Sequence, residues 1–233
     1  MSNETWPLWS EADAARRARS VALMDSRGIP HMPRLPMITQ AEAGCRAPEE
    51  IARRLLAMFG VCVYCEVRSG GAAREETDKY LRRIDGMLPG GLTGALTPAE
   101  ARFLAVEPPV QQDLANFGWR YECCHVLMWA LGIAPELGFP GGICDVSAMG
   151  GIIWRLEDVA DLLSQAAPRP EAELLDAADV VLLYDWACVD ARINRRTAPG
   201  GLNGEVVMEW HHATNWLVGA YENADWDQVG TDT

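Results

Sequence analysis

Two short motifs have the residue types and the spacing of a carboxylate-rich metal site. Glu122 and His125 form one Glu-x-x-His motif, and Glu209 and His212 form the second. Residues three apart lie on the same face of a helix, so each pair can point toward one ion. Two such motifs, with one carboxylate from each of two further helices, form the ligand set of di-iron and di-manganese helix bundles. Candidates for the further carboxylates are Glu49, Glu50, Asp179, Asp185 and Asp190.

Several features weigh against this metal site. Short Glu-x-x-His matches arise easily by chance, and the flanking residues give no independent sign that the two helices face each other. Adjacent helical residues point about 100° apart, so His211 and His212 do not easily serve one ion. The chain also lacks the His-Glu-x-x-His motif of many zinc enzymes. A metal therefore stays one hypothesis among several, and no cofactor is assigned.

A carboxylate within an otherwise apolar stripe is the second candidate for chemistry. At helical spacing, one face of the segment 171–194 carries Asp179, Leu182, Leu183, Trp186, Asp190 and Ile193. A buried Asp190 needs a partner, because an unpaired buried charge is very costly. Arg120, Arg192 and a tryptophan N–H are the candidates for that partner.

Two interpretations of this carboxylate remain open. A buried polar and aromatic network would fix how the helices pack, whereas a carboxylate with a shifted pKa would act as an acid or a base. The expected network consists of Trp119, Arg120, Trp186, Asp190, Arg192, Asn215 and Trp216. The catalytic alternative uses Glu122, Asp190 and His211, which must then meet in one solvent-reachable pocket. We expect His211 to be a hydrogen-bonded polar residue near the core, with Asn215 four residues later as a candidate partner.

The seven cysteines form no recognisable zinc or disulfide framework. Cys62-x-x-Cys65 stands without a second such pair, and the strand–helix context of redox proteins is not evident around it. Cys123, Cys124 and Cys188 lie in apolar stretches, where cysteine usually acts as a small hydrophobic residue. We expect these thiols to have a packing role, in a reducing compartment.

The elements that must position these residues are expected to be helices. Thr97-Pro98-Ala99-Glu100 has the pattern of a capping box with proline in the first turn, and Asn203 has the type of a helix N-cap. The run 61–65 is rich in β-branched residues, but only Gly60 separates it from the preceding helix, so we expect that helix to continue. The expected helices cover residues 10–27, 48–69, 73–85, 97–107, 110–131, 155–166, 171–194 and 204–221.

These segments predict an all-α fold. We find no segment that alternates as a half-buried strand does, and no repeat or low-complexity linker divides the chain. The expected architecture is a single globular domain over residues 1–233, with about seven or eight helices joined by irregular Gly/Pro-rich connections. The segment 132–151, rich in Gly and Pro, is expected to be an irregular loop.

The balance of charge limits the expected partners. The net charge of −13 argues against a nucleic-acid-binding surface, which needs clustered Lys and Arg. Nine carboxylates and one base, Arg169, lie between Glu157 and Asp190, a pattern that suits either a solvated surface or docking of a basic protein partner. The first residues show no signal peptide, and no apolar run approaches the ~20 residues of a membrane span. We therefore expect a cytoplasmic protein that binds neither nucleic acid nor membrane.

Short motifs along the chain carry a resemblance to a known family. In order, they are Arg17-Ala18-Arg19-Ser20, Gly28-Ile29-Pro30, Leu35-Pro36, Arg46-Ala47-Pro48-Glu49-Glu50-Ile51-Ala52-Arg53-Arg54, Leu96-Thr97-Pro98-Ala99-Glu100, Trp119-Arg120-Tyr121-Glu122, Trp129-Ala130-Leu131-Gly132, Ile143-Cys144-Asp145-Val146, Trp186-Ala187-Cys188-Val189-Asp190-Ala191-Arg192, Asn215-Trp216-Leu217, Asp225-Trp226-Asp227 and Thr231-Asp232-Thr233.

With these motifs the chain resembles the bacterial family of the domain of unknown function 4272 over nearly its whole length. The resemblance implies a single-domain bacterial protein and no particular activity. The family pattern has no histidine at positions 125 and 212, whereas His211 fits it, and this departure weakens the metal hypothesis further. Because the resemblance extends into the tail, we expect residues 225–233 to dock on the helical core.

The leading expectation for function is a non-enzymatic interaction or accessory protein. It rests on the lack of a complete catalytic set and on the acidic segment, which a basic partner could contact. The alternative is an enzyme or small-molecule binder that uses Glu122, Asp190 and His211, with or without a di-metal carboxylate site. The sequence leaves the oligomeric state open.

Overall fold

Helix α2 (Pro48–Ser69) runs through the hydrophobic core of the computed structural model, which describes residues 9–233 apart from the side chains of residues 221 and 223. From Ile51 to Cys65 nearly every α2 side chain is buried, because other helices surround it. This burial accommodates the β-branched run 61–65 within a helix, and the expected continuation of the helix is confirmed.

The remaining helices bring distant parts of the chain together. They are α1 (Glu11–Ser26), α3 (Arg74–Met87), α4 (Pro98–Ala105), α5 (Gln111–Gly118), α6 (Tyr121–Ala130), α7 (Val146–Ile153), α8 (Val159–Gln165), α9 (Glu171–Ile193), α10 (Gly204–Leu217) and α11 (Ala220–Asn223), with short 3-10 turns at Pro199–Gly201 and Trp226–Gln228.

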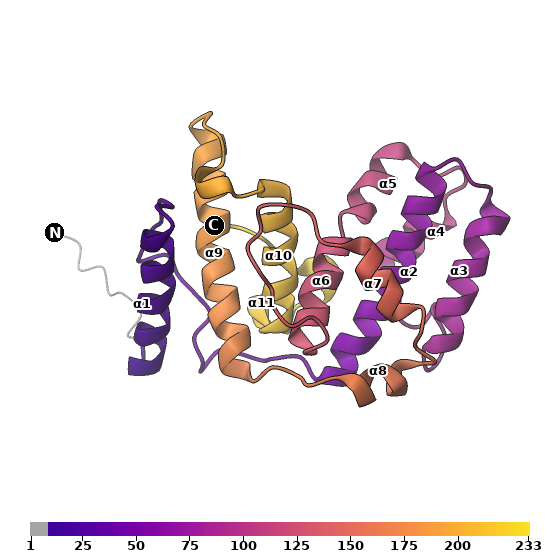
Figure 1. The fold of residues 1–233 in the computed structure, drawn as a ribbon, viewed down its shortest axis with the longest axis horizontal. Coiled ribbons are helices and arrows are strands. Elements are labelled where there is room, and N and C mark those ends of the chain that lie inside the picture. Colours follow the sequence, from indigo (N-terminus) through magenta and orange to yellow (C-terminus); the bar gives the residue numbers. More distant parts are fainter. Residues whose placement is uncertain (1–8) are drawn as a thin grey trace.

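Figure 1 shows α1 and α9 at one end of the molecule, α6 and α10 in the middle, and α2 and α3 toward the other end. Helix α9 packs against α10 on one side and against α1 on the other. Helix α10 in turn packs against α6, which contacts α2. This order places α10 between the end of the molecule that holds α1 and α9 and the large core around α2.

The helix expected over residues 110–131 is two helices. Helix α5 ends at Gly118, and Trp119 and Arg120 form a turn before α6 begins. The N–H of Arg120 bonds to the carbonyl of Phe117, three residues back, so the regular four-residue ladder is interrupted there. The break sets the direction of α6, which carries Glu122.

Two further boundaries differ from those expected. The segment 132–151 is not wholly irregular, since α7 begins within it after Asp145, whose side chain accepts a hydrogen bond from the N–H of Ala148 at 2.8 Å. The helix expected from residue 155 starts only after Asp158, which caps α8 in the same way. In both places an aspartate N-cap sets the start of the helix. The α7 segment was not expected to be helical because its glycines have a low helix propensity.

The described residues contain helices and no strand, so the predicted all-α fold is confirmed. Irregular connections rich in Gly and Pro join the helices, as expected. Among these residues, no helix combines the length and the apolar character that crossing a membrane requires.

Candidate functional site

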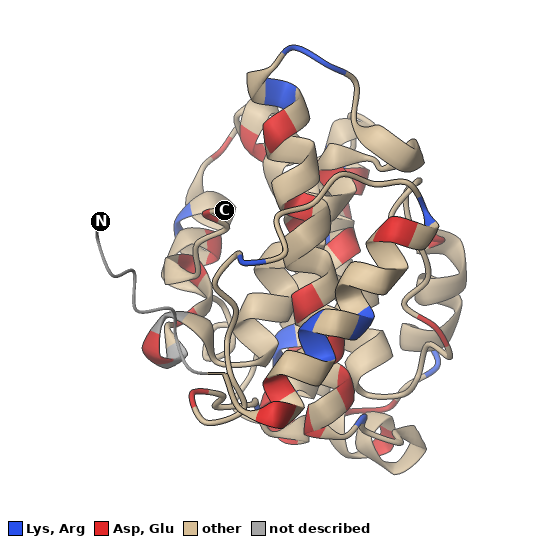
Figure 2. Ribbon diagram, turned by 90° about the vertical axis from the view of Figure 1, so that its left-hand side faces the viewer, with Lys and Arg blue, Asp and Glu red and all other residues tan. Residues whose placement is uncertain are grey.

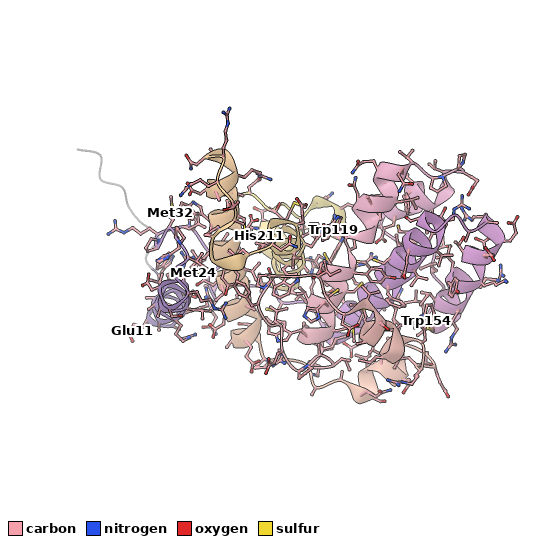
Figure 3. All side chains as sticks on the ribbon, turned by 45° about the horizontal axis from the view of Figure 1, so that its top comes forward. Glu11, Met24, Met32, Trp119, Trp154 and His211 are labelled. Atoms are coloured by element: carbon pink, nitrogen blue, oxygen red, sulfur yellow. The ribbon has the colours of Figure 1, made fainter. Side chains whose placement is uncertain are left out.

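A histidine–carboxylate pair lies between α9 and α10. Nδ1 of His211 on α10 is 3.0 Å from Oδ2 of Asp185 on α9. Only 1% of His211 and 4% of Asp185 is exposed. Figure 3 shows the labelled His211 between the orange α9 and the yellow α10, far from Trp154. The pair is therefore held inside the contact between the two helices.

The hydrogen bond to Asp185 fixes which ring nitrogen of a neutral His211 carries the proton. An ionised carboxylate only accepts hydrogen bonds, so Nδ1 is the N–H donor and Nε2 keeps its lone pair. No hydrogen-bond partner of Nε2 is found among the described residues. This atom is also absent from the unpaired atoms that are fully enclosed by protein. His211 also lines a cavity of about 280 Å³.

The cavity is formed by three separate parts of the chain. The connector after α1 supplies one side, α9 and α10 supply another, and the C-terminal tail reaches its edge. The Nδ2 group of Asn215, one turn after His211 on α10, donates a hydrogen bond of 3.0 Å to the carbonyl of Gly230 and so ties the tail to α10. The lining residues are Pro36, Met37, Ile38, Glu42, Leu175, Ala178, Asp179, Leu182, His211, Asn215, Ala220 and Asp232.

A buried ion pair anchors α1 beside this cavity. Arg17 on α1 donates from Nη2 to Oδ1 of Asp179 at 2.6 Å and from Nε to the same oxygen at 3.1 Å. Its Nη1 group donates to the carbonyl of Pro33 in the connector. Both side chains are excluded from water, so the carboxylate of Asp179 is neutralised within the cavity wall.

The first Glu-x-x-His motif is divided between two different environments. Oε2 of Glu122 accepts a hydrogen bond from the indole N–H of Trp210 at 3.1 Å, and Oε1 accepts one from the N–H of Cys144 at 2.7 Å. Nε2 of His125 is 3.0 Å from the carbonyl of Leu137. Both side chains thus have protein partners that hold them apart from a common ligand.

The second motif is divided in the same way. Glu209 accepts a hydrogen bond from Arg120 at 3.1 Å and one from the thiol of Cys123, also at 3.1 Å. Burial raises the pKa of Glu209, while the charge of Arg120 opposes that shift. Within residues 9–233, the structure forms no group of three or more His, Cys, Asp or Glu residues able to hold a metal. Glu122, His125, Glu209 and His212 are therefore not brought together around a metal position.

His212 points into a different environment from its neighbour His211. Its Nε2 atom is buried without a hydrogen-bond partner in the described part of the chain, and its ring lies 4.7 Å from that of Trp226. Burial, and next the positive charge of Arg120, together lower the pKa of His212 to about 3. His212 is accordingly neutral at physiological pH.

Asp190 is only partly buried, so the condition under which it would need a buried partner is not met. Asp190 lies near the end of α9, where that helix extends past its neighbours, and Ile193 there is 73% exposed. Its carboxylate pairs with Arg196 at 2.5 Å and with the side chain of Asn194, instead of with Arg120 or the exposed Arg192. Because solvent reaches this end of the helix, the pair forms locally.

The three residues of the catalytic alternative do not share one pocket. His211 lines the cavity between the connector, α9 and α10, whereas Glu122 lines a separate apolar cavity of about 350 Å³ beside α2 and α5. Asp190 lies at the exposed end of α9. Of these three, only His211 belongs to the cavity between α9 and α10.

The expected polar and aromatic network is likewise dispersed. Trp119 and Trp216 pack on the large core, whereas Trp186 packs on a smaller cluster beside α1. Trp216 contacts Trp226 at a ring distance of 5.3 Å, and this contact together with Asn215 confirms that the tail docks on α10. The segments therefore share a fold but not one hydrogen-bonded network.

The cysteines are free thiols. Burial raises the pKa of Cys65 to about 12 and that of Cys62 well above its usual range. Both side chains are therefore protonated at neutral pH, and a thiol is a much weaker nucleophile than a thiolate. The packing role expected for these residues is consistent with this environment.

Sequence reasoning missed the partners that define the buried ion pairs. Asp185 was considered only as a metal ligand, Asp179 as a metal ligand and as a member of the apolar stripe, and Arg17 only as part of a family motif. The available signal was an acidic side chain flanked by apolar residues on both sides, as in Leu183-Tyr184-Asp185-Trp186. A second buried pair, Arg54 with Glu100 at 2.6 Å, was missed because Glu100 was interpreted only as part of the capping box at the start of α4.

The comparison with protein families covers almost the whole chain. A family model described as Domain of unknown function (DUF4272) matches residues 16–229, a range that includes Arg17, Asp179, Asp185 and His211. The comparisons with curated proteins and with solved structures found no match. The match agrees with the resemblance carried by the short motifs, and the chain belongs to the DUF4272 family.

Proposed function

We propose that the protein binds a small molecule in the His211 cavity and that His211 accepts a proton from a hydroxyl or N–H group of that molecule. The observation that carries the proposal is the free Nε2 lone pair of a buried histidine whose Nδ1 is held by Asp185. Nε2 is not among the fully enclosed unpaired atoms, so a ligand donor can reach it and take the place of water there. Such a donor would give Nε2 a hydrogen-bond partner.

The chemistry of the proposal is that of a general base. In the bound state Nε2 accepts a hydrogen bond from the ligand. It would take the proton only as that ligand group reacts, and the carboxylate of Asp185 would then stabilise the imidazolium, as a carboxylate does for the histidine of hydrolase triads. The cavity of about 280 Å³ is near the lower end of the range for ligand pockets, so it suits a small ligand. This proposal keeps His211 from the catalytic alternative and replaces Glu122 and Asp190 by Asp185.

Docking of a basic protein on the acidic segment stays a prediction, and the geometry supports it less than it supports ligand binding in the His211 cavity. Figure 2 faces the end of the molecule with α1 and α9, and it shows basic segments among the acidic ones. Five of the nine carboxylates between residues 157 and 190 already pair within the chain, namely Glu173, Asp176, Asp179, Asp185 and Asp190. Few carboxylates therefore remain for a partner.

A bacterial, cytoplasmic setting is part of the same proposal. The free thiols of the seven cysteines favour a reducing compartment, in which they would persist.

The experiment uses three six-carbon probes that differ only in the polar end: hexylamine, hexanol and hexanoate. Long-range 1H–15N NMR spectra of protein with labelled histidine rings report on each ring nitrogen. We expect at least one hydrogen-donating probe, the amine or the alcohol, to shift Nε2 of His211 and to leave the His125 ring unchanged. If neither donor probe shifts the His211 signals at millimolar concentration, the proposed function is wrong.

Two neighbouring substitutions on α9 locate the binding. Ala178 lines the cavity, whereas Ala177 lies on another side of the helix. Ala178→Leu should fill the cavity and abolish the response of His211, and Ala177→Leu should preserve it. Equal responses in the two variants would show that the probe binds elsewhere.

A further inference from the structure

We infer that the ligand of the His211 cavity is a primary ammonium compound with a short apolar chain. The inference rests on the proposed function and names the ligand class for the same site. It follows from the hydrogen-bonding character, the charge and the apolar walls of the cavity, and each of these selects the same chemistry.

The polar atoms available in the cavity are mainly hydrogen-bond acceptors. Nε2 of a neutral His211 is an acceptor because Asp185 holds the proton on Nδ1. Asn215 uses one of its two N–H groups to bond to the carbonyl of Gly230, and its amide oxygen adds an acceptor. The carboxylates of Glu42 and Asp232 at the edge also accept only. A ligand that matches these atoms must present several N–H or O–H donors, and an ammonium group presents three.

The charge of the walls is negative. Glu42 and Asp232 are exposed at the edge of the cavity, and the N–H and hydroxyl of Thr39 hydrogen-bond to Glu42 and lower its pKa, so it stays ionised. Two basic side chains that bond to lining residues already have anionic partners, Arg17 with Asp179 and Arg16 with Asp13. The cavity therefore attracts a cation and repels a carboxylate or a phosphate.

The rest of the lining is apolar and accounts for the chain of the ligand. Hydrocarbon surface comes from the connector on one side and from α9 on the other, and a short alkyl or aryl group is stabilised by leaving water for such surface. The residues that provide it are Pro36, Met37, Ile38, Leu175, Ala178 and Leu182. Pairing with Nε2 of His211, a residue that lines the same cavity, would set where the donor end of the ligand lies.

The affinities of the same three probes, measured by calorimetry, test the ligand class. We expect hexylamine to bind about tenfold more tightly than hexanol, since hydrogen bonds to a charged group are the stronger ones. Hexanoate should not bind measurably. The double variant Glu42→Gln/Asp232→Asn should lose the preference for the amine and keep the affinity for hexanol. The matched control, Glu75→Gln/Glu76→Gln on α3, removes two exposed charges away from the cavity and should keep the preference.

The outcomes separate the two proposals. If hexanol binds at least as tightly as hexylamine and shifts His211, the ammonium class is wrong while the proposed function stands. The ammonium class is also wrong if the control pair removes the preference as fully as the cavity pair, because general attraction to an acidic protein would then explain it. If no probe binds, the proposed function itself fails, and the ligand class fails with it.

Discussion

Nδ1 of His211 lies 3.0 Å from Oδ2 of Asp185, and this pair lies within the buried interface between α10 and α9. The contact gives the carboxylate a partner and orients the ring of a residue that also lines the cavity. A structural role and a chemical role are therefore combined in one pair of side chains. Separating the two roles requires variants that change the charge and keep the size.

Asp185→Asn is the first such variant. Its amide can donate to Nδ1, which would move the ring proton of His211 to Nε2. We expect the 15N spectrum to show an increased Nε2–H form, the amine probe to lose its response, and the free energy of unfolding to fall by about 1–3 kcal/mol. Asp190→Asn on the exposed end of α9 is the control and should cost less than about 1 kcal/mol. An unchanged tautomer in Asp185→Asn would contradict the role assigned to this carboxylate.

Arg17 and Asp179 give a second prediction, on stability. Replacing one member, as in Arg17→Met, leaves a buried charge without its partner, and we expect a loss of about 3–5 kcal/mol in urea denaturation. The double variant Arg17→Met/Asp179→Leu should recover most of that loss, because both charges are then removed. Additive losses in the double variant would show that packing, not the ion pair, dominates.

A second ion pair between the same two helices provides the control for this prediction. Arg19 on α1 pairs with Asp176 on α9 at 2.6 Å, but both side chains are largely exposed. Exposed pairs contribute little, so Arg19→Met should change the stability by less than about 1 kcal/mol. The comparison isolates burial, because the helices and the residue types are shared.

Much of the helical framework was predictable, since it depends on local signals. The capping box at Thr97 and Glu100 forms as the sequence indicates, and Asn203 caps α10. The break at Trp119 was not predictable from periodicity, because apolar residues continue at helical spacing on both sides of it. Local signals therefore identify most helices but not every point at which the chain changes direction.

The candidate site was predictable only in part. His211 stood out as a polar residue in an apolar segment, but Asp185 is its partner through the packing of α9 on α10, which the spacing of residues along one helix does not determine. The role considered for Asp190 did not follow from its position in the stripe. Its face of α9 has helical periodicity, but α9 extends beyond the helices packed against it, so Asp190 is reached by solvent.

His212 gives a prediction on pH dependence. Its pKa is lowered to about 3 in the folded protein, against about 6.5 for an unperturbed histidine, so the unfolded chain binds the proton more readily. Stability from this group is complete above pH ~6.5 and is lost as the pH falls toward 3, by at most about 1.4 kcal/mol per pH unit. Urea denaturation across this range should therefore show less acid destabilisation in His212→Leu than in the natural protein.

The unfolding free energies of the variant and of the natural protein above pH 7 are the reference for the His212 experiment. There the ring is neutral in both states, so the difference in unfolding free energy between the variant and the natural protein should be constant. Below pH 6.5 that difference should shift in favour of the variant. A difference that stays constant down to pH 4 would mean that His212 is protonated in the folded protein without cost.

Gly132 supports the last prediction, on the backbone where α6 ends. Its φ of +71° is in the left-handed region, and a Cβ added there would lie 2.1 Å from the carbonyl oxygen of Ala167. Gly138 also has positive φ, +83°, but a Cβ there would meet nothing within 4 Å. We expect Gly138→Ala to cost about 1–2 kcal/mol from conformation alone, and Gly132→Ala to cost about 2–5 kcal/mol because the backbone of residue 167 must also move. Equal losses of unfolding free energy in the two variants would show that the close approach of residues 132 and 167 does not constrain the fold.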